Sequence, residues 1–139
     1  MSFLQTLAGD DGSLPRYAAD QGAAGVVPEG VGAGNVNAEV FEIVEYVLKK
    51  GVAVVLATRV YHGGVLSVYS DQGGGATMER GGVNLGGDLT GPKARILLMM
   101  ALSQIKGYHG RLRMIHSVSL PSSRTQSFRF SIEISSSSL

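Results

Sequence analysis

One segment constrains the fold of this chain more than any other: a strand, a helix and a second strand in succession between residues 23 and 59. A short apolar run, AAGVVP, precedes a glycine-rich loop, and VAVVLATR is a near-continuous β-branched run. Such a run is typical of a strand that is buried on both faces. Between the two runs, apolar residues recur at helical spacing at Val40, Val44, Val47 and Leu48. The pattern predicts a βαβ unit with parallel strands and a right-handed crossover.

The ends of the predicted helices carry capping signals. Asn37 is a suitable N-cap for the helix of this unit, and Gly51 follows its last turn. Ser13 is the cap signal of an earlier short helix that ends at Gly22. A further helix is expected from about residue 91 to 105, with Thr90 as its cap. That helix is apolar almost all round, so it should either be covered by protein on several sides or press against a partner. The favoured place for the pair at 99–100 is the core.

The remaining segments complete a fold prediction. GVLSVYS is a candidate for another strand, and DQGGGATMERGG is expected to be a flexible, glycine-dense loop. We therefore expect a small three-layer α/β domain, with a parallel sheet of about four strands and helices on both faces. The expected division is an N-terminal extension over 1–9, the α/β domain over 10–106, and a serine-rich basic tail over 107–139. In that tail SFRFSIEIS alternates strictly, which fits an edge strand or a disordered segment.

Composition excludes several classes of function. The chain has no cysteine, so it has neither disulfides nor thiolate metal ligands. No run approaches the roughly 18 apolar residues of a membrane span, and the start shows no secretory signal, so the cytoplasm is the default expectation. The net charge of +1 is uneven, because an acidic body precedes a basic tail. No basic stripe with interleaved aromatics is present, so we expect neither nucleic-acid nor membrane binding.

The glycine loop ahead of the first long helix poses the question of function. Gly30, Gly32 and Gly34 alternate in EGVGAGN, which differs from the dinucleotide fingerprint because its third glycine comes one residue early. The strand that follows ends in LATR, without the acidic residue that binds a ribose, and no G-K-[ST] of a P-loop occurs. Nucleotide binding is therefore weakly supported.

The loop nevertheless has a use in binding. Ligands of open parallel sheets lie outside the carboxyl ends of the strands, and this loop occupies that position together with Glu29, Thr58 and Arg59. Glycines let the backbone approach a ligand closely, and Asn35 adds an amide that both donates and accepts hydrogen bonds. Taken alone, Asn35 is equally explained as a residue that tolerates a left-handed turn.

Three segments in order then provide a resemblance. EGVGAGNVNAEVFE, GVAVVLATRV and GVNLGGDLTGPKARILLMMAL resemble the C-terminal domain of the bacterial-type L-asparaginases, a family that includes the glutaminase-asparaginases. The resemblance runs from about residue 10 to residue 105. The G-x-G-x-G-N loop and the D-L-T start of the last helix are specific in combination.

The resemblance implies an activity and the part that this domain takes in it. Members hydrolyse the side-chain amide of asparagine to aspartate and ammonia without a metal or organic cofactor. Their nucleophile is a threonine of a T-G-G-T motif in a larger N-terminal domain. The asparagine that matches Asn35 reaches the substrate bound by a neighbouring subunit, so Asn35 is the expected substrate-binding residue. The family also supplies an acidic residue after the second strand, but the glycines at 73–75 prevent a choice between Asp71 and Glu79.

The departures from the family decide what the chain does by itself. None of its threonines lies in a T-G-G-T motif, so no catalytic residue is predicted. Ser67 beside Tyr69 and His62 is a chance cluster more often than a catalytic one. His109 and His116 lack neighbouring carboxylates, so no metal site is expected. Arg59 is more often a packing or ion-pair residue than a carboxylate clamp.

We therefore expect an asparaginase-type C-terminal domain that is inactive alone. Its partners would be a second copy or an asparaginase N-terminal domain, with asparagine as the small-molecule substrate. The serine-rich ending departs from what the family would have there, which suggests that the chain is a truncated or mis-spliced product. The alternative is a stand-alone binding or dimerisation module without catalysis, and the choice between asparagine and glutamine stays open.

Overall fold

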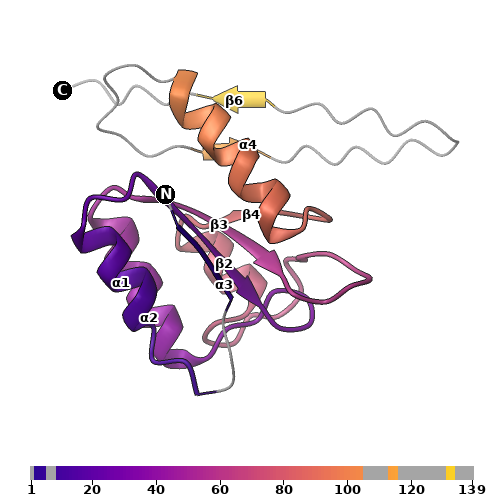
Figure 1. The fold of residues 1–139 in the computed structure, drawn as a ribbon. Coiled ribbons are helices and arrows are strands. Elements are labelled where there is room, and N and C mark those ends of the chain that lie inside the picture. The colour runs from indigo at the N-terminus through magenta and orange to yellow at the C-terminus, as the bar shows by residue number, and fades with distance from the viewer. Residues whose placement is uncertain (1, 6–8, 105–112, 116–130, 134–139) are drawn as a thin grey trace, which may run out of the picture.

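The computed structural model describes residues 2–5, 9–104, 113–115 and 131–133. Its main sheet has four parallel strands in the order β1-β2-β3-β4 (Figure 1). The strands are β1 (Ser2–Gln5), β2 (Gly25–Gly30), β3 (Ala53–Thr58) and β4 (Asn84–Leu85). The predicted parallel sheet of about four strands is confirmed.

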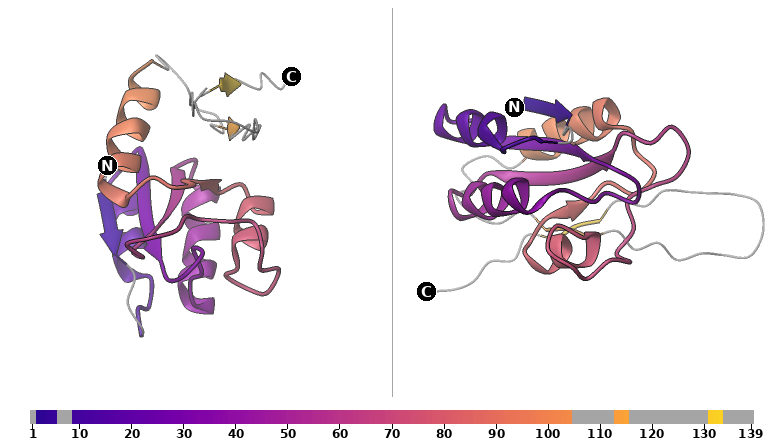
Figure 2. Two further views of the ribbon diagram at one scale, coloured as in Figure 1. Left: turned by 90° about the vertical axis from the view of Figure 1, so that its right-hand side faces the viewer. Right: turned by 90° about the horizontal axis from the view of Figure 1, so that it is seen from below.

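Four helices cover the sheet on both faces, which confirms the three-layer α/β prediction. They are α1 (Ser13–Asp20), α2 (Ala38–Lys49), α3 (Gly75–Arg80) and α4 (Gly91–Gln104). The first three pack against one face, and α4 packs against the other. The left view of Figure 2 shows the strands between α4 on one side and α2 and α3 on the other. The unit β2-α2-β3 is the predicted βαβ element.

The alternation of side chains along β3 divides the core into two layers. Val54 and Leu56 point to the layer of α1, α2 and α3, whereas Val55 and Ala57 point to α4. All four side chains are buried, which explains why this strand reads as an unbroken apolar run. The same alternation places Glu29 of β2 on the α4 side and Thr58 on the other side.

The ends of α2 follow the predicted capping. The Asn37 side chain accepts a hydrogen bond from Val40 N at 2.8 Å, and its Nδ2 donates to Asp10 O at 2.7 Å. Gly51 takes a positive φ of 78° directly after the helix. Asn37 thus joins α2 to the segment ahead of α1.

Substituting Asn37 with alanine should lower the free energy of unfolding by about 1 kcal/mol, within the usual range of 0.5–2 for a lost N-cap. The reason is that Val40 N loses its acceptor at an exposed helix start. Chemical denaturation of the 139-residue chain measures the change. An unchanged midpoint would contradict the capping role.

The predicted cap of α1 is wrong by one residue. Gly12 in a left-handed conformation is the N-cap, and Ser13 is the first helical residue. Two aspartates supply acceptors here: Asp10 accepts from Gly12 N at 2.8 Å, and Asp11 accepts from Ser13 N at 2.9 Å. The bond from Ser13 N holds the pKa of Asp11 below its ordinary value. Ser13 is not the cap because the helix already begins at it, and Gly12 before it has no side chain to make a capping bond.

A polar cluster joins the outer surfaces of α1 and α2. Asp20 accepts hydrogen bonds from the Tyr46 hydroxyl and from Lys50 Nζ. Arg16 and Lys50 each lie 5.0 Å from the centre of the Tyr46 ring. The hydrogen bond with Lys50 lowers the pKa of Asp20 and raises that of Lys50. The cluster is exposed, so its contribution to the stability of the domain is small.

Two predictions between β3 and α4 are wrong. GVLSVYS contains no strand; Leu66 and Val68 are exposed, and only Val65 of its apolar residues is buried. The glycine-dense segment after it contains α3, because burial of Met78 against the core outweighs the low helical propensity of glycine. Beyond α3 the chain adds the short edge strand β4.

Helix α4 is covered less completely than expected. Ala94, Leu98 and Ala101 pack on the sheet. Met99 and Met100 were predicted to lie in the core, but Met99 is 42% exposed and Met100 is 61% exposed. Ile96, on the same side of the helix, is 54% exposed. The sheet covers only one side of this helix, which leaves an apolar stripe on its outer side.

Several predictions concern the ends of the chain. Residues 2–5 of the expected N-terminal extension form β1, whereas residues 1 and 6–8 lie outside the described part. In the tail, β5 (Arg113–Ile115) and β6 (Ser131–Glu133) pair in antiparallel fashion. His109, His116 and most of SFRFSIEIS lie outside the described residues.

Over the described residues, no helix has the length and apolar character needed to cross a membrane.

Candidate functional site

The glycine loop closes on itself at the carboxyl end of β2. Val31 N donates to Asn35 O at 2.9 Å, and Asn35 N donates back to Val31 O at 2.8 Å. Gly34 N donates to Val31 O at 3.0 Å. These bonds turn residues 31–35 into a compact hairpin-like turn. The turn delivers Asn35 to the edge of the sheet just before α2.

Two glycines of the loop have different surroundings. Gly34 has a φ of 98°, and a Cβ placed on it would lie 2.6 Å from Cγ1 of Val65. Gly32 also has a positive φ, but a Cβ there would meet no atom within 4 Å. Gly34 is therefore needed for packing as well as for its backbone conformation, whereas Gly32 is needed only for the turn.

The end of β3 holds this turn in place. Thr58 pairs with Gly30 in the sheet and is buried. Its hydroxyl donates to Gly32 O at 2.7 Å and accepts from Val60 N at 3.2 Å. The backbone N–H of Arg59 donates to Gly30 O at 3.1 Å. The residues predicted to gather at this edge are thus brought together.

The long loop between β3 and α3 packs against the glycine turn through backbone groups. Val36 N donates to Gly73 O at 3.0 Å, and Leu66 N donates to Ala33 O at 3.1 Å. A Cβ on Gly73 would lie only 2.2 Å from Val36 O. The two loops therefore touch so closely that only glycine fits at position 73.

This contact separates the two acidic candidates. Asp71 lies in the turn that contains Gly73, at the same edge as the glycine loop, and its backbone carbonyl accepts from Gly74 N at 3.0 Å. Glu79 lies in the last turn of α3, next to the chain that enters β4 from the amino end of the sheet. Of the two, Asp71 is on the edge that carries Asn35.

Asn35 carries an oxygen that is buried without a partner. Its Oδ1 makes no hydrogen bond to any residue that the structure describes. A buried polar atom left in this state costs about 1–3 kcal/mol, and such atoms are few in native proteins. The backbone of Asn35 closes the turn, whereas its Oδ1 adds no hydrogen bond within the described residues.

Glu29 joins the loop to α4. It is buried on the α4 side of β2, and its Oε1 accepts from Gly91 N at 3.0 Å, in the first turn of that helix. A carboxylate at a helix N-terminus is favoured by the helix dipole. Glu29 is therefore built into the fold, and the separation of 62 residues along the chain explains why sequence alone did not reveal the bond.

The weaker candidates do not form sites. Arg59, Ser67 and His62 are exposed, and no hydrogen bond within residues 9–103 joins Ser67 to His62. The His62 ring lies edge-on to that of Tyr61, with 4.6 Å between centres. Within the described residues, no three His, Asp or Glu side chains gather to hold a metal ion.

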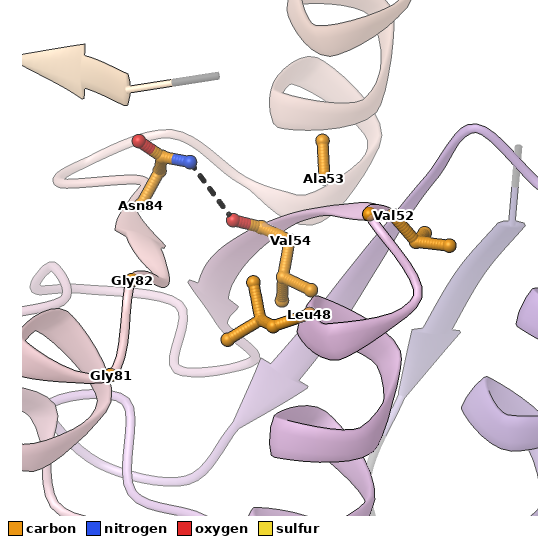
Figure 3. Close-up of a pocket in the computed structure, with 8 residues that line it drawn as sticks. Leu48, Val52, Ala53, Val54, Gly81, Gly82 and Asn84 are labelled. Carbon is orange, nitrogen blue, oxygen red and sulfur yellow. Dashed lines mark hydrogen bonds between the residues drawn. The ribbon is translucent and has the colours of Figure 1, made fainter. Parts of the chain in front are cut away.

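A shallow hollow lies at the opposite end of the sheet. Figure 3 shows Leu48 and Val54 on one side and Asn84 on the other, with Asn84 Nδ2 donating to Val54 O at 3.2 Å. Its lining is mostly apolar and its polar side chain is already engaged by the sheet. The hollow is thus a groove between α2 and β4 rather than part of the carboxyl-edge site.

The fold and the residues at the carboxyl end of the sheet together define a class of protein. It is a parallel α/β domain with a glycine turn that carries an asparagine beside the carboxyl ends of its strands. Residues 2–112 match the Glutaminase/Asparaginase C-terminal domain, and the chain belongs to this family. It is 35% identical over 96 residues to L-asparaginase from Bacillus licheniformis, covering 69% of this chain and 30% of that protein.

Two further comparisons agree. A protein named probable L-asparaginase from Deinococcus radiodurans is 38% identical over 81 residues, which are 58% of this chain and 24% of that one. The crystal structure of a probable cytoplasmic L-asparaginase from Campylobacter jejuni matches 75% of this chain and 30% of its own, with 32% identity and a TM-score of 0.64. The chain thus spans about 30% of the length of such relatives.

Proposed function

We propose that this chain is the part of an asparaginase-type amidohydrolase that supplies a subunit interface and one substrate contact to a catalytic domain on another polypeptide. The reaction served is hydrolysis of L-asparagine to L-aspartate and ammonia. The observation that carries the proposal is the unpartnered Oδ1 of Asn35, at the carboxyl edge of the sheet, in a turn that is closed by backbone bonds. The cytoplasm is the proposed compartment.

The proposal assigns Asn35 the role of a hydrogen-bonding contact to the substrate. An amide oxygen that the fold leaves without a donor is suited to accept a hydrogen bond from a polar group brought by the neighbouring domain. Asp71, on the same edge, is the acidic residue that we assign to the border of the same site. A carboxylate there would complement the α-amino group of an amino-acid substrate.

Among the described residues, no threonine hydroxyl is hydrogen-bonded to a side chain that could act as its base. Thr58 donates its hydroxyl proton to Gly32 O and Thr77 donates to Ser70 O. Neither has a base positioned to activate it. We therefore propose that the chain alone does not hydrolyse asparagine.

A stand-alone dimerisation module is the second candidate. The exposed stripe of α4 with Ile96, Met99 and Met100 favours it, since contiguous exposed apolar residues mark association surfaces. The two functions differ in one measurable respect. Mixing a dimerisation module with an asparaginase catalytic domain should produce no asparaginase activity. Mixing the proposed substrate-contact domain with that catalytic domain should produce it.

Substituting Asn35 with alanine should lower the asparaginase activity of the reconstituted pair by roughly tenfold to a hundredfold, since a hydrogen bond to a charged or polarised group contributes about 1.5–3 kcal/mol. The assay mixes this chain with the portion of the Bacillus licheniformis enzyme that it does not match and follows ammonia release. Thermal stability should stay the same or rise, because the buried oxygen has no partner to lose.

Asn37→Ala is the matched control, two residues along the chain. It removes a helix cap rather than a substrate contact. We expect it to lower the melting temperature and leave kcat/KM unchanged. Equal effects of both substitutions on activity would contradict the assignment of Asn35.

A further inference from the structure

Thr58 lies where three parts of the carboxyl edge meet. Its hydroxyl donates to Gly32 O at the tip of the glycine turn and accepts from Val60 N at the start of the long loop. A hydroxyl has one proton to donate, and here the short bond of 2.7 Å to Gly32 O uses it, with Gly30 O more distant at 3.5 Å. The side chain itself is 6% exposed and belongs to a strand anchored in the core.

On one side the long loop holds the tip of the turn, because Leu66 N donates to Ala33 O at 3.1 Å. Gly32 is exposed and has open space around the position of a Cβ. The bonds between Val31 and Asn35 close the neck of the turn but do not fix its direction relative to the sheet. The Thr58 hydroxyl makes the side-chain bond that ties the tip directly to a buried strand of the sheet, whereas Leu66 ties it to another loop.

We propose that Thr58 is a positioning residue for Asn35: it sets the orientation of the glycine turn, and through it the orientation of the Asn35 amide. This inference rests on the proposed function for its catalytic consequence, but the positioning itself is a property of the free chain. It also makes Thr58 a link between the turn and the loop that carries Asp71.

The test is a spectrum of the ¹⁵N-labelled 139-residue chain. Its side-chain amide pairs come from three asparagines, Asn35, Asn37 and Asn84, and from five glutamines. Asn35→Asp identifies the pair of interest by removing it. Asn84 is an internal control, because it donates to Val54 O at the other end of the sheet.

Thr58→Val keeps the shape of the side chain and removes the hydroxyl, whereas Thr58→Ser keeps the hydroxyl and removes a methyl group. We expect the Asn35 pair to shift or broaden in Thr58→Val and to return to its native position in Thr58→Ser, with Asn84 unmoved in both. An Asn35 pair unaffected by Thr58→Val would overturn the proposal.

If Thr58→Val does not fold, Thr58→Ala and Thr58→Ser form a second pair. Both variants lack the methyl group, and only Thr58→Ser keeps the hydroxyl. A shift of the Asn35 pair in the alanine variant alone supports positioning, and identical spectra overturn it. In the reconstituted assay, the variant without the hydroxyl should lose roughly tenfold to a hundredfold in kcat/KM, as expected for a misplaced contact. Displacement of Asn35 without any loss of kcat/KM would support positioning and overturn the substrate contact.

Discussion

Substituting Gly73 with alanine should separate the two loops at the carboxyl edge and lower the free energy of unfolding by more than about 2 kcal/mol. Two effects add up. A non-glycine residue at the φ of 86° is strained by about 1–2 kcal/mol. The new Cβ would also lie 2.2 Å from the backbone oxygen of Val36, which no rotamer change can relieve.

Gly82→Ala is the matched control for this experiment. Gly82 has a comparable φ of 100°, but a Cβ there would meet no atom within 4 Å. The difference between the two variants therefore measures the contact between loops. Hydrogen exchange provides the local readout, since Val36 N donates to Gly73 O and should lose protection only in Gly73→Ala. Equal destabilisation in both variants would contradict the loop contact.

Substituting Leu56 with alanine should lower the free energy of unfolding by about 2–5 kcal/mol, the range seen when a buried leucine is truncated. Leu56 is fully buried in the middle of β3, and it lies directly beneath the glycine turn: a Cβ on Gly34 would be 3.3 Å from its Cδ2. The cavity would remove support from the core and from the turn together.

Leu66→Ala serves as its control, because the same truncation is made at a side chain that is 56% exposed. We expect a change within about 0.5 kcal/mol there. Chemical denaturation of both variants gives the two free energies of unfolding. They are compared when the dependence of that free energy on denaturant concentration is the same in both. Similar losses for Leu56 and Leu66 would contradict the described core.

The periodic elements were predictable from sequence. The stripe that includes Val40, Val44 and Val47 predicts α2, and the β-branched run predicts β3, because each pattern matches one period over many residues. Asn37 and Gly51 fixed the ends of α2 through local chemistry alone. A resemblance in three segments then identified the family that the comparison confirms.

Short elements were not predictable, because distant contacts create them. Helix α3 depends on the burial of Met78, and β4 depends on pairing with Val55 and Leu56. The strand predicted at 64–70 does not form because, of its apolar residues, only Val65 is buried, in contact with the position of Gly34. Strand β1 is defined by its register with β2.

The same limit applies to the candidate site. The glycine pattern and Asn35 were visible in the sequence, and so was the position of Thr58 at a strand end. The hydrogen bond from Thr58 to Gly32 O and the contact of Gly73 with Val36 became apparent only when the loops were placed in space. The buried oxygen of Asn35 has no signal in sequence, since it is defined by what surrounds it.

Ammonia release from L-asparagine by the purified 139-residue chain tests the central claim most directly, measured alone and after addition of the unmatched portion of the Bacillus licheniformis enzyme. The account predicts no release by the chain alone and release by the mixture that depends on Asn35. Release by the chain alone, abolished by Asn35→Ala, would contradict it, because a nucleophile would then have to lie within these 139 residues.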